Sequence, residues 1–392
     1  MTSNVMAIQF FSKRAEANLA MLGLVAALIF LVLFGIMGLF RSGSLGFDFV
    51  VFHDAGVLFL QGINPWSASI DSGAPFSYPP HLGSFVALYG LLSFKAGLTL
   101  HTLLNLASIF SIAYLANHWF IGIRSLRDMS LVQGVCLALI VGNPFVAHSV
   151  YEGQWSLPAA AALFWSWHFL HNQRWVLSGV FLGLATIKPQ VSLLYIVWLL
   201  LTLNIRVLLV GGTLALLMLL PTVLRFGLID TIDAWFASMR YYATQWANIP
   251  GSPHVVGLEG FFVALGTNGY GVALKALSGV AIAALFFFRM YLSPLLIVHF
   301  FLVIALTFIY GHDTDFVIVS VLWSYLFWLA ANRNTYVSLG VALGLILLMF
   351  FPQRIIRAFD IPLLFHTRTF ILLVCCWVAY SWERAQKNTI HN

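Results

Sequence analysis

The sequence is a succession of apolar runs, many of them about as long as a membrane is thick, separated mostly by short polar stretches. A helix needs about 20 apolar residues to cross the hydrocarbon layer of a bilayer. Charged residues make up only 8% of the 392 residues and hydrophobic types 61%, whereas an ordinary soluble domain carries roughly 25% charged residues. This excludes a soluble globular enzyme, a disordered protein and a nucleic-acid-binding protein. We expect an all-α integral membrane protein.

About twelve runs are predicted to cross the membrane within a single polytopic domain, 1–392. The first is too long for the core of a signal peptide and lacks a convincing cleavage site. The stretch 79–94 is apolar but short and begins with Pro79-Pro80, so we expect it to lie at the interface without crossing. The predicted spans are 19–40, 98–120, 130–150, 156–171, 175–187, 190–204, 206–224, 271–288, 292–310, 316–331, 335–351 and 363–382.

The distribution of charge predicts an orientation. With the N-terminus in the cytoplasm, the inside segments hold ten basic residues and three acids, and the outside segments hold nine basic residues and ten acids. An excess of Lys and Arg inside is the usual tendency of membrane proteins. We therefore expect an integral membrane protein with both termini cytoplasmic. The outside acids are Asp48, Asp54, Asp71, Glu152, Asp230, Asp233, Glu259, Asp313, Asp315 and Asp360.

Two outside segments, 41–97 and 225–270, are long, and long ordered loops usually carry function. Asp48 stands just beyond the first span and opens a predicted short amphipathic helix. One face of that helix would hold Asp48, Phe52, Ala55 and Phe59. Asp54 is six residues past Asp48, roughly 240° round the helix, and would point elsewhere. The plain alternative for Asp48 is a solvated loop acid or a helix cap.

Three further polar clusters lie at outside edges of apolar runs: 151–154, 188–190 and 310–315. On the predicted topology they face the same side as Asp48 and could converge on one cavity. Lys188 interrupts a long apolar stretch just before a helix-breaking Pro, and ionisable residues at membrane depth tend to be functional. The alternative is a lysine whose head reaches out to the interface.

These clusters resemble glycosyltransferase family 87, whose members have the GT-C architecture and use polyprenyl-phosphate sugars. The resemblance covers roughly residues 45–200. It is carried, in order, by Asp48-Phe49, Phe52, Ala55, Gly62-Ile63-Asn64-Pro65-Trp66, Tyr78-Pro79-Pro80, Gly153-Gln154, and a small-residue-rich helix that ends in Lys188-Pro189. His312-Asp313 stands where members often carry a His-containing outside motif.

The resemblance implies a GT-C-type helical bundle that inverts the sugar configuration as it transfers the sugar, with Asp48 as general base. The donor would be a polyprenyl-phosphate sugar, mannose by family weighting, and the acceptor a lipid or glycan at the extracytoplasmic face. The membrane would be the bacterial plasma membrane. No glycine-rich nucleotide loop is present, which agrees with a lipid-linked donor. Candidates for the leaving phosphate are Lys188, His312 and Arg240. Candidates for the sugars or acceptor are Tyr78, Trp66, Gln154, Asp313 and Asp54.

No cofactor is expected. The pair Asp313 and Asp315 leaves a divalent ion open, but two acids alone are an incomplete ligand set. His53-Asp54 departs from the family pattern, which often has Tyr or a small residue there. The expected partners are the sugar donor, the acceptor and membrane lipids. The three cysteines, Cys136, Cys375 and Cys376, lie inside apolar runs without zinc or disulfide spacing.

Two rival functions fit parts of the sequence. A transporter or flippase for a lipid-linked or polar solute fits the composition, but no internal repeat is obvious and the first outside loop is long. A polymerase or ligase of the O-antigen type would use a later, Arg-rich outside loop. The segment 225–270 contains only Arg225 and Arg240, which ranks that function third.

Overall fold

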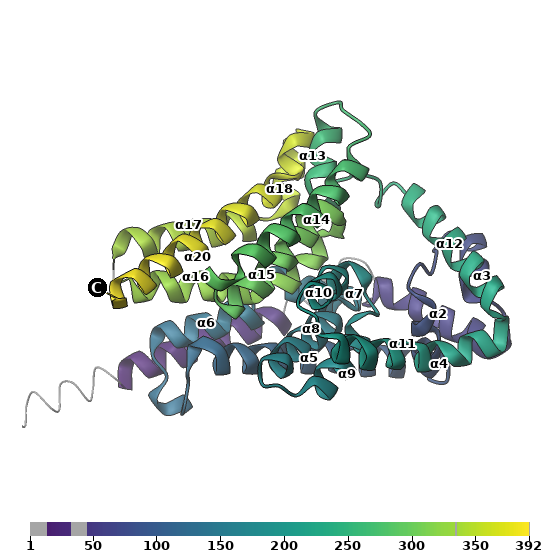
Figure 1. Ribbon diagram of the computed structural model, residues 1–392, viewed down its shortest axis with the longest axis horizontal. Helices are drawn as coiled ribbons and strands as arrows, with labels where there is room; N and C mark the ends of the chain where they lie inside the picture. The colour runs from purple at the N-terminus through teal and green to yellow at the C-terminus, as the bar shows by residue number, and fades with distance from the viewer. Residues whose placement is uncertain (1–13, 33–44, 334, 392) are drawn as a thin grey trace, which may run out of the picture.

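The computed structural model describes residues 14–32, 45–333 and 335–391, and these residues are almost entirely helical (Figure 1). The first helix is Arg14–Val32. The α-helices that follow are α2 (Phe47–Gln61), α3 (Pro65–Asp71), α4 (Gly83–Gly90), α5 (Phe94–Ala116), α6 (Leu131–Val141), α7 (Pro144–Glu152), α8 (Ser156–His171), α9 (Trp175–Ala185), α10 (Pro189–Leu201), α11 (Ile205–Phe226), α12 (Leu228–Thr244), α13 (Leu258–Ala264), α14 (Gly271–Phe288), α15 (Pro294–Ile304), α16 (Ser320–Asn332), α17 (Tyr336–Phe350), α18 (Gln353–Ala358), α19 (Pro362–Phe365) and α20 (Thr367–His391).

Shorter elements join these helices. Two π-helical turns extend α5 and α15, and the remaining short elements are 3-10 turns and one pair of strands. They are η1 (Pro80–Leu82), η2 (Asn117–Ile121), η3 (Leu126–Asp128), β1 (Val255–Val256), η4 (Arg289–Tyr291), η5 (Ala305–Ile309), β2 (Gly311–His312) and η6 (Asp313–Val319).

Six helical segments in the described part of the chain are long and apolar enough to cross a membrane: Arg14–Val32, Phe94–Ile121, Leu131–Glu152, Ile205–Phe226, Gly271–Tyr291 and Asp313–Asn332. Shorter apolar helices cover four more of the expected runs, and α8 and α20 cover the other two. The all-α membrane fold is therefore confirmed. The span count of twelve and the GT-C details stay predictions, and the end of the first expected run lies outside the described residues.

The spanning helices differ in how much of their surface the protein covers. In an apolar 18-residue window of each helix, 22% of the residues are buried in Ile205–Phe226 and in Gly271–Tyr291. In Asp313–Asn332 the buried share is 89%. Apolar helices with bare surface suit contact with lipid tails, and a helix buried all round suits the centre of a bundle. The segment that carries Asp313 and Asp315 is therefore the most enclosed of the six.

The first long segment folds into short helices, none of which is among the six candidate spans of the described residues. Helix α4 has 8 residues and spans only about 12 Å at 1.5 Å per residue, which is too short for a bilayer. Helix α2 buries Phe49, Phe52, Ala55, Gly56 and Phe59, so the predicted apolar face is confirmed. Asn64 caps α3 by accepting the Trp66 N–H at 3.1 Å.

The second long segment, 225–270, is also ordered. It contains α12, β1 and α13, and β1 pairs with β2 in antiparallel register, with Val255 opposite His312 and Val256 opposite Gly311. This pairing ties the segment to the His312 stretch. We expected a long loop here; the chain instead forms a helix of 17 residues, α12.

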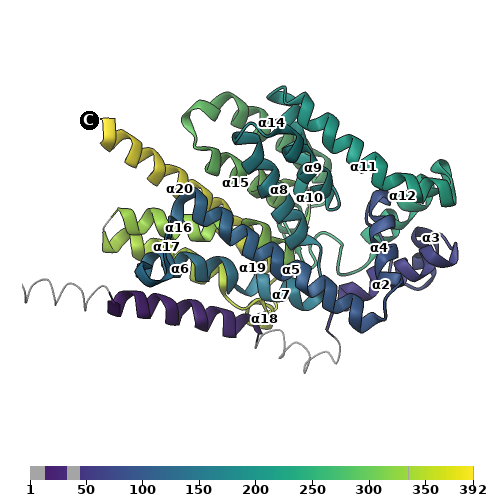
Figure 2. The ribbon, with the colours of Figure 1, turned by 90° about the horizontal axis from the view of Figure 1, so that it is seen from below.

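Two apolar cores result. The larger is built mainly by α5–α8, α10, α15–α17 and α20, and the smaller by α2–α4 with Trp155, Ile187, Met218 and Ala234. Figures 1 and 2 both show α2–α4 with α12 at one end and α16, α17 and α20 at the other. Trp155 and Ile187 stand beside Gln154 and Lys188, so these polar residues lie where the two cores meet.

Candidate active site

Asp48 lies in the first turn of α2, where the fold joins that helix to the end of α7. Gly46 adopts φ 80° before α2, and its N–H donates to the Tyr151 carbonyl at 2.8 Å. Gly153 ends α7 at φ 74°, a left-handed conformation that suits glycine, and a side chain there would press on α2. The turn aims the Gln154 amide at Asp48, whose carboxylate accepts a hydrogen bond from Gln154 Nε2.

Tyr78 completes this Asp48 group, defined as Asp48, Gln154 and Tyr78. Its hydroxyl donates to Gln154 Oε1 at 3.3 Å. Burial, and then the charge of Asp48, raise the pKa of Tyr78 above its usual 10, so the hydroxyl stays a donor. The Trp66 ring is 0% exposed and donates from Nε1 to the Tyr78 carbonyl at 2.8 Å. Trp66 therefore holds Tyr78 in place and offers no open face to a sugar in this structure.

His101 and Tyr89 support the Asp48 group through hydrogen bonds. Neither residue was predicted from the sequence. His101 Nε2 donates to the Gln154 carbonyl at 3.3 Å, and the Tyr89 hydroxyl lies 2.9 Å from His101 Nδ1. A carbonyl only accepts, so the proton sits on Nε2 and, in the neutral ring, Nδ1 accepts from Tyr89. A polar residue in an otherwise apolar helix was the available signal for His101.

Lys188 lies in a second cluster, the Lys188 group: Lys188, Asp315, Ser156 and His312. The Lys188 ammonium is 3% exposed and forms a buried ion pair with Asp315, which is 0% exposed. It also donates to Ser156, whose hydroxyl contacts Asp315 at 2.7 Å. Residues of the predicted clusters 151–154, 188–190 and 310–315 therefore lie close together, and their convergence on one cavity stays a prediction. The neutralisation of Lys188 by Asp315 was not predicted from the sequence.

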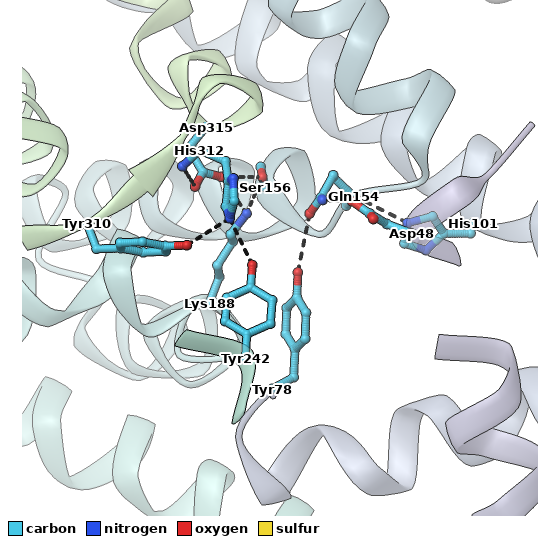
Figure 3. A network of polar contacts seen from close by, with 10 residues as sticks. All are labelled: Asp48, Tyr78, His101, Gln154, Ser156, Lys188, Tyr242, Tyr310, His312 and Asp315. Atoms are coloured by element: carbon cyan, nitrogen blue, oxygen red, sulfur yellow. Dashed lines mark hydrogen bonds and ion pairs between the residues drawn. The ribbon is translucent and has the colours of Figure 1, made fainter. Parts of the chain in front are cut away.

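His312 joins the Lys188 group through its backbone and faces two tyrosines through its ring. Its N–H donates to Asp315 Oδ2 at 3.0 Å, and its Nε2 lies 2.8 Å from the Tyr242 hydroxyl and 2.9 Å from the Tyr310 hydroxyl (Figure 3). Burial lowers the pKa of His312, which favours the neutral ring. Tyr242 comes from α12 and was missed, because the sequence does not show that α12 folds back over β2.

The two groups are neighbours. Gln154 and Ser156 are two residues apart at the α7–α8 junction, and Lys188 lies close enough to Asp48 to interact with its charge. Burial, and then the charge of Glu152, raise the pKa of Asp48 to about 8, while Lys188 acts in the opposite direction. A carboxyl with this pKa is a stronger base than an exposed aspartate.

Glu152 is a further acid at this junction. It pairs with His148 at 2.8 Å, one turn earlier on α7. The pair is partly open, since the side chains are 33% and 22% exposed for His148 and Glu152. Glu152 stands in the predicted cluster 151–154, but no local pattern favoured it over Gln154 as a site residue.

Other predicted residues lie apart from the two groups. The Asp54 side chain is 66% exposed and lies 3.6 Å from His53, on the face of α2 away from Asp48. Arg240 is exposed on α12 and makes no polar contact with the described residues. Asp313 faces Arg357 at 3.7 Å, so Asp313 and Asp315 serve different cations.

The described residues do not provide the grouped side chains that a metal site needs. In the described ranges, no three His, Cys, Asp or Glu residues are grouped so that they could hold a metal ion. A divalent ion at the Asp-x-Asp pair would need both carboxylates to leave their present partners.

Comparison with known proteins gives one match. Residues 76–352, more than half of the chain, match the family model described as Glycosyltransferase family 87. Neither the curated proteins nor the solved structures gave a match. The matched range contains Tyr78, Gln154, Lys188 and His312, and it begins after Asp48.

Proposed function

The chain belongs to glycosyltransferase family 87 and is a membrane glycosyltransferase, and on this premise we propose which reaction it performs. It transfers a sugar, for which mannose is our choice, from a polyprenyl-phosphate donor to a lipid or glycan acceptor. The reaction takes place at the extracytoplasmic face and inverts the configuration at the anomeric carbon.

The observation that carries the proposal is the position of Asp48. Its carboxylate is half-buried, oriented by Gln154 and next to the Lys188 group. In the proposed step Asp48 takes the proton from the acceptor hydroxyl while the hydroxyl oxygen attacks the anomeric carbon. The bond from that carbon to the phosphate oxygen breaks, and the lipid phosphate leaves with the electron pair. One displacement inverts the centre.

The leaving phosphate needs donors and positive charge. In the proposal Lys188 supplies the charge, and His312 with the Tyr242 and Tyr310 hydroxyls supplies donors. Asp315 offsets Lys188 in the structure, so the pair is neutral before the donor arrives. A neutral pair avoids burying an isolated ammonium and still leaves one Lys188 N–H for a phosphate oxygen.

Tyr78 and Gln154 are the candidates for contact with the sugars, because both are partly exposed. Gln154 donates a hydrogen bond to Asp48, and Tyr78 donates one to Gln154. Trp66 supports Tyr78 from the core. We expect transfer without an added divalent cation, so EDTA should leave the rate unchanged.

The test uses the purified chain in liposomes with a synthetic polyprenyl-phosphate mannose and a membrane lipid extract as acceptor. Wild-type protein should transfer sugar, and Asp48→Asn should lower the rate by at least about a hundredfold, the scale of a lost general base. Asp71→Asn is the matched control, since Asp71 is exposed at the end of α3 in the same segment. Full activity of Asp48→Asn would end the assignment of the base. Solute flux without transfer would favour the transporter.

A further inference from the structure

Two arginines near the start of α20, Arg357 on α18 and Arg368 in the first turn of α20, carry charge that the described residues compensate poorly. Arg368 is 6% exposed, yet no carboxylate lies within 4.0 Å of it in the described part of the chain. Its Nε is buried and has no hydrogen-bond partner among the residues that the structure describes. Burying an unpaired charge costs several kcal/mol, so a guanidinium in this state calls for an anion.

The contacts that Arg368 does make fix its position without neutralising it. Its Nη2 donates to the Phe351 carbonyl at 2.6 Å, and its guanidinium lies 5.1 Å from the centre of the Phe145 ring on α7. These contacts hold the planar group in one orientation. They leave the Nε–H of Arg368 without an acceptor among the described residues.

Arg357 is the second cation. Its Nη2 lies 3.7 Å from Asp313, 3.1 Å from the Pro253 carbonyl and 3.3 Å from His254 Nδ1, while its Nε is buried without a partner. Arginine only donates, so His254 Nδ1 accepts. Arg368 lies close enough to interact electrostatically with both Arg357 and Asp313. Arg357 therefore has one loosely placed carboxylate, and Arg368 has none within ion-pair distance among the described residues.

We propose that Arg357 and Arg368 form a binding site for a phosphate group, separate from the Lys188 group. The guanidinium fork matches phosphate oxygens, and a phosphate can accept from two guanidiniums at once. The site adjoins the candidate active site, because Asp313 directly follows His312 and its N–H donates to the His254 carbonyl at 3.0 Å. The phosphate belongs to a lipid headgroup or to a soluble phosphate compound. The site does not depend on the proposed transfer reaction.

The experiment measures the melting temperature of the full chain in neutral detergent. Sodium phosphate is titrated against sodium chloride of equal ionic strength, and short-chain phosphatidylglycerol against short-chain phosphatidylcholine carrying the same acyl chains. We expect a saturable rise of the melting temperature with phosphate or phosphatidylglycerol beyond the controls. In Arg368→Gln and Arg357→Gln the half-saturating concentration should rise by about tenfold or more, the scale of a charge-assisted hydrogen bond.

Matched variants make the outcome decisive. Arg354→Gln removes an exposed arginine from α18 and should keep the response, and Asp48→Asn should keep it even if transfer is abolished. If Arg368→Gln does not fold, Arg357→Gln, whose side chain is 29% exposed, carries the test. Saturation by phosphatidylglycerol at lower concentration than by phosphate identifies a lipid headgroup, and the reverse identifies a soluble phosphate. A response no larger than the controls, or one lost equally in Arg354→Gln, overturns the site.

Discussion

At the scale of single residues, Asp48 gives a prediction about pH. Its pKa is raised from 3.8 to about 8, so the carboxyl is mostly protonated below pH 8 and cannot act as a base there. Activity should therefore be lost as the pH falls below this pKa. We expect kcat/KM to rise about tenfold per pH unit up to about pH 8 and then to level off. Steady-state transfer at pH 5.5–9.5 measures this, and a rise complete by pH 5 would contradict it.

Lys188 gives a prediction that separates stability from catalysis. Removing one member of a buried ion pair leaves the other charge uncompensated, at a cost of about 3–5 kcal/mol. Lys188→Met should therefore lower the free energy of unfolding by about that amount, because Asp315 would be left buried and charged. The double variant Lys188→Met/Asp315→Asn should recover most of the loss and still use the donor poorly.

Chemical denaturation in detergent measures the stabilities of the two variants, and transfer at varied donor concentration measures their donor use. If the single variant is as stable as wild type, the ion pair contributes little. If the double variant uses the donor normally, Lys188 does not bind the phosphate.

The sequence best predicts site residues that are charged but stand within or beside apolar stretches. Lys188 stood out because a charge interrupts an apolar stretch, and the structure places it in a polar cluster with His312. Its partner Asp315 could not be chosen, because pairing between residues 127 positions apart depends on packing that no local pattern encodes. Tyr242 was hidden for the same reason. Trp66 shows what a local pattern leaves out, since an aromatic ring predicted as a sugar or acceptor contact lies in the core of this structure. Its contact with substrate stays a prediction.

At the scale of elements, the close packing of α2 against α4 positions Asp48. A Cβ at Gly56 would overlap the Val86 carbonyl oxygen and lie 2.8 Å from the Gly90 nitrogen. Gly56→Ala should therefore push the two helices apart and move α2. Small displacements of a catalytic group are costly, so we expect transfer to fall roughly tenfold to a hundredfold with normal membrane insertion.

Gly212→Ala is the control for this prediction, because Gly212 also lies inside a helix and a Cβ there would meet nothing within 4 Å. Transfer rates and membrane yields of the two variants are compared side by side. Equal activity in Gly56→Ala and Gly212→Ala would show that the spacing of α2 and α4 does not position Asp48.

Element prediction succeeded where a single physical rule dominates. Apolar length predicted the long helices, and Pro79-Pro80 correctly marked a stretch too short to cross. Within 130–150 the chain breaks into α6 and α7, where Asn143 caps the second helix before Pro144. The helices of 225–270 were not predicted. Helix α12 packs on α3, which lies far away in the sequence, and no local pattern encodes that contact.

At the scale of the whole molecule, composition and fold agree on a membrane protein, and the distribution of charge predicts which side the site faces. The Asp48 group and the Lys188 group lie together, so we expect both on one side of the membrane. The excess of basic residues in the opposite segments predicts that this side is extracytoplasmic. This orientation is the part of our proposal that rests on charge alone.

Cysteine labelling tests the orientation, because the three native cysteines are all buried and free and should give little background. Asp71 and Arg174 are exposed, on segments expected outside and inside. A membrane-impermeant maleimide should label Asp71→Cys in intact spheroplasts, and Arg174→Cys only after permeabilisation. The reverse pattern would place the site in the cytoplasm, where nucleotide sugars are available. It would remove the main physical reason for a lipid-linked donor, while the family membership would stand.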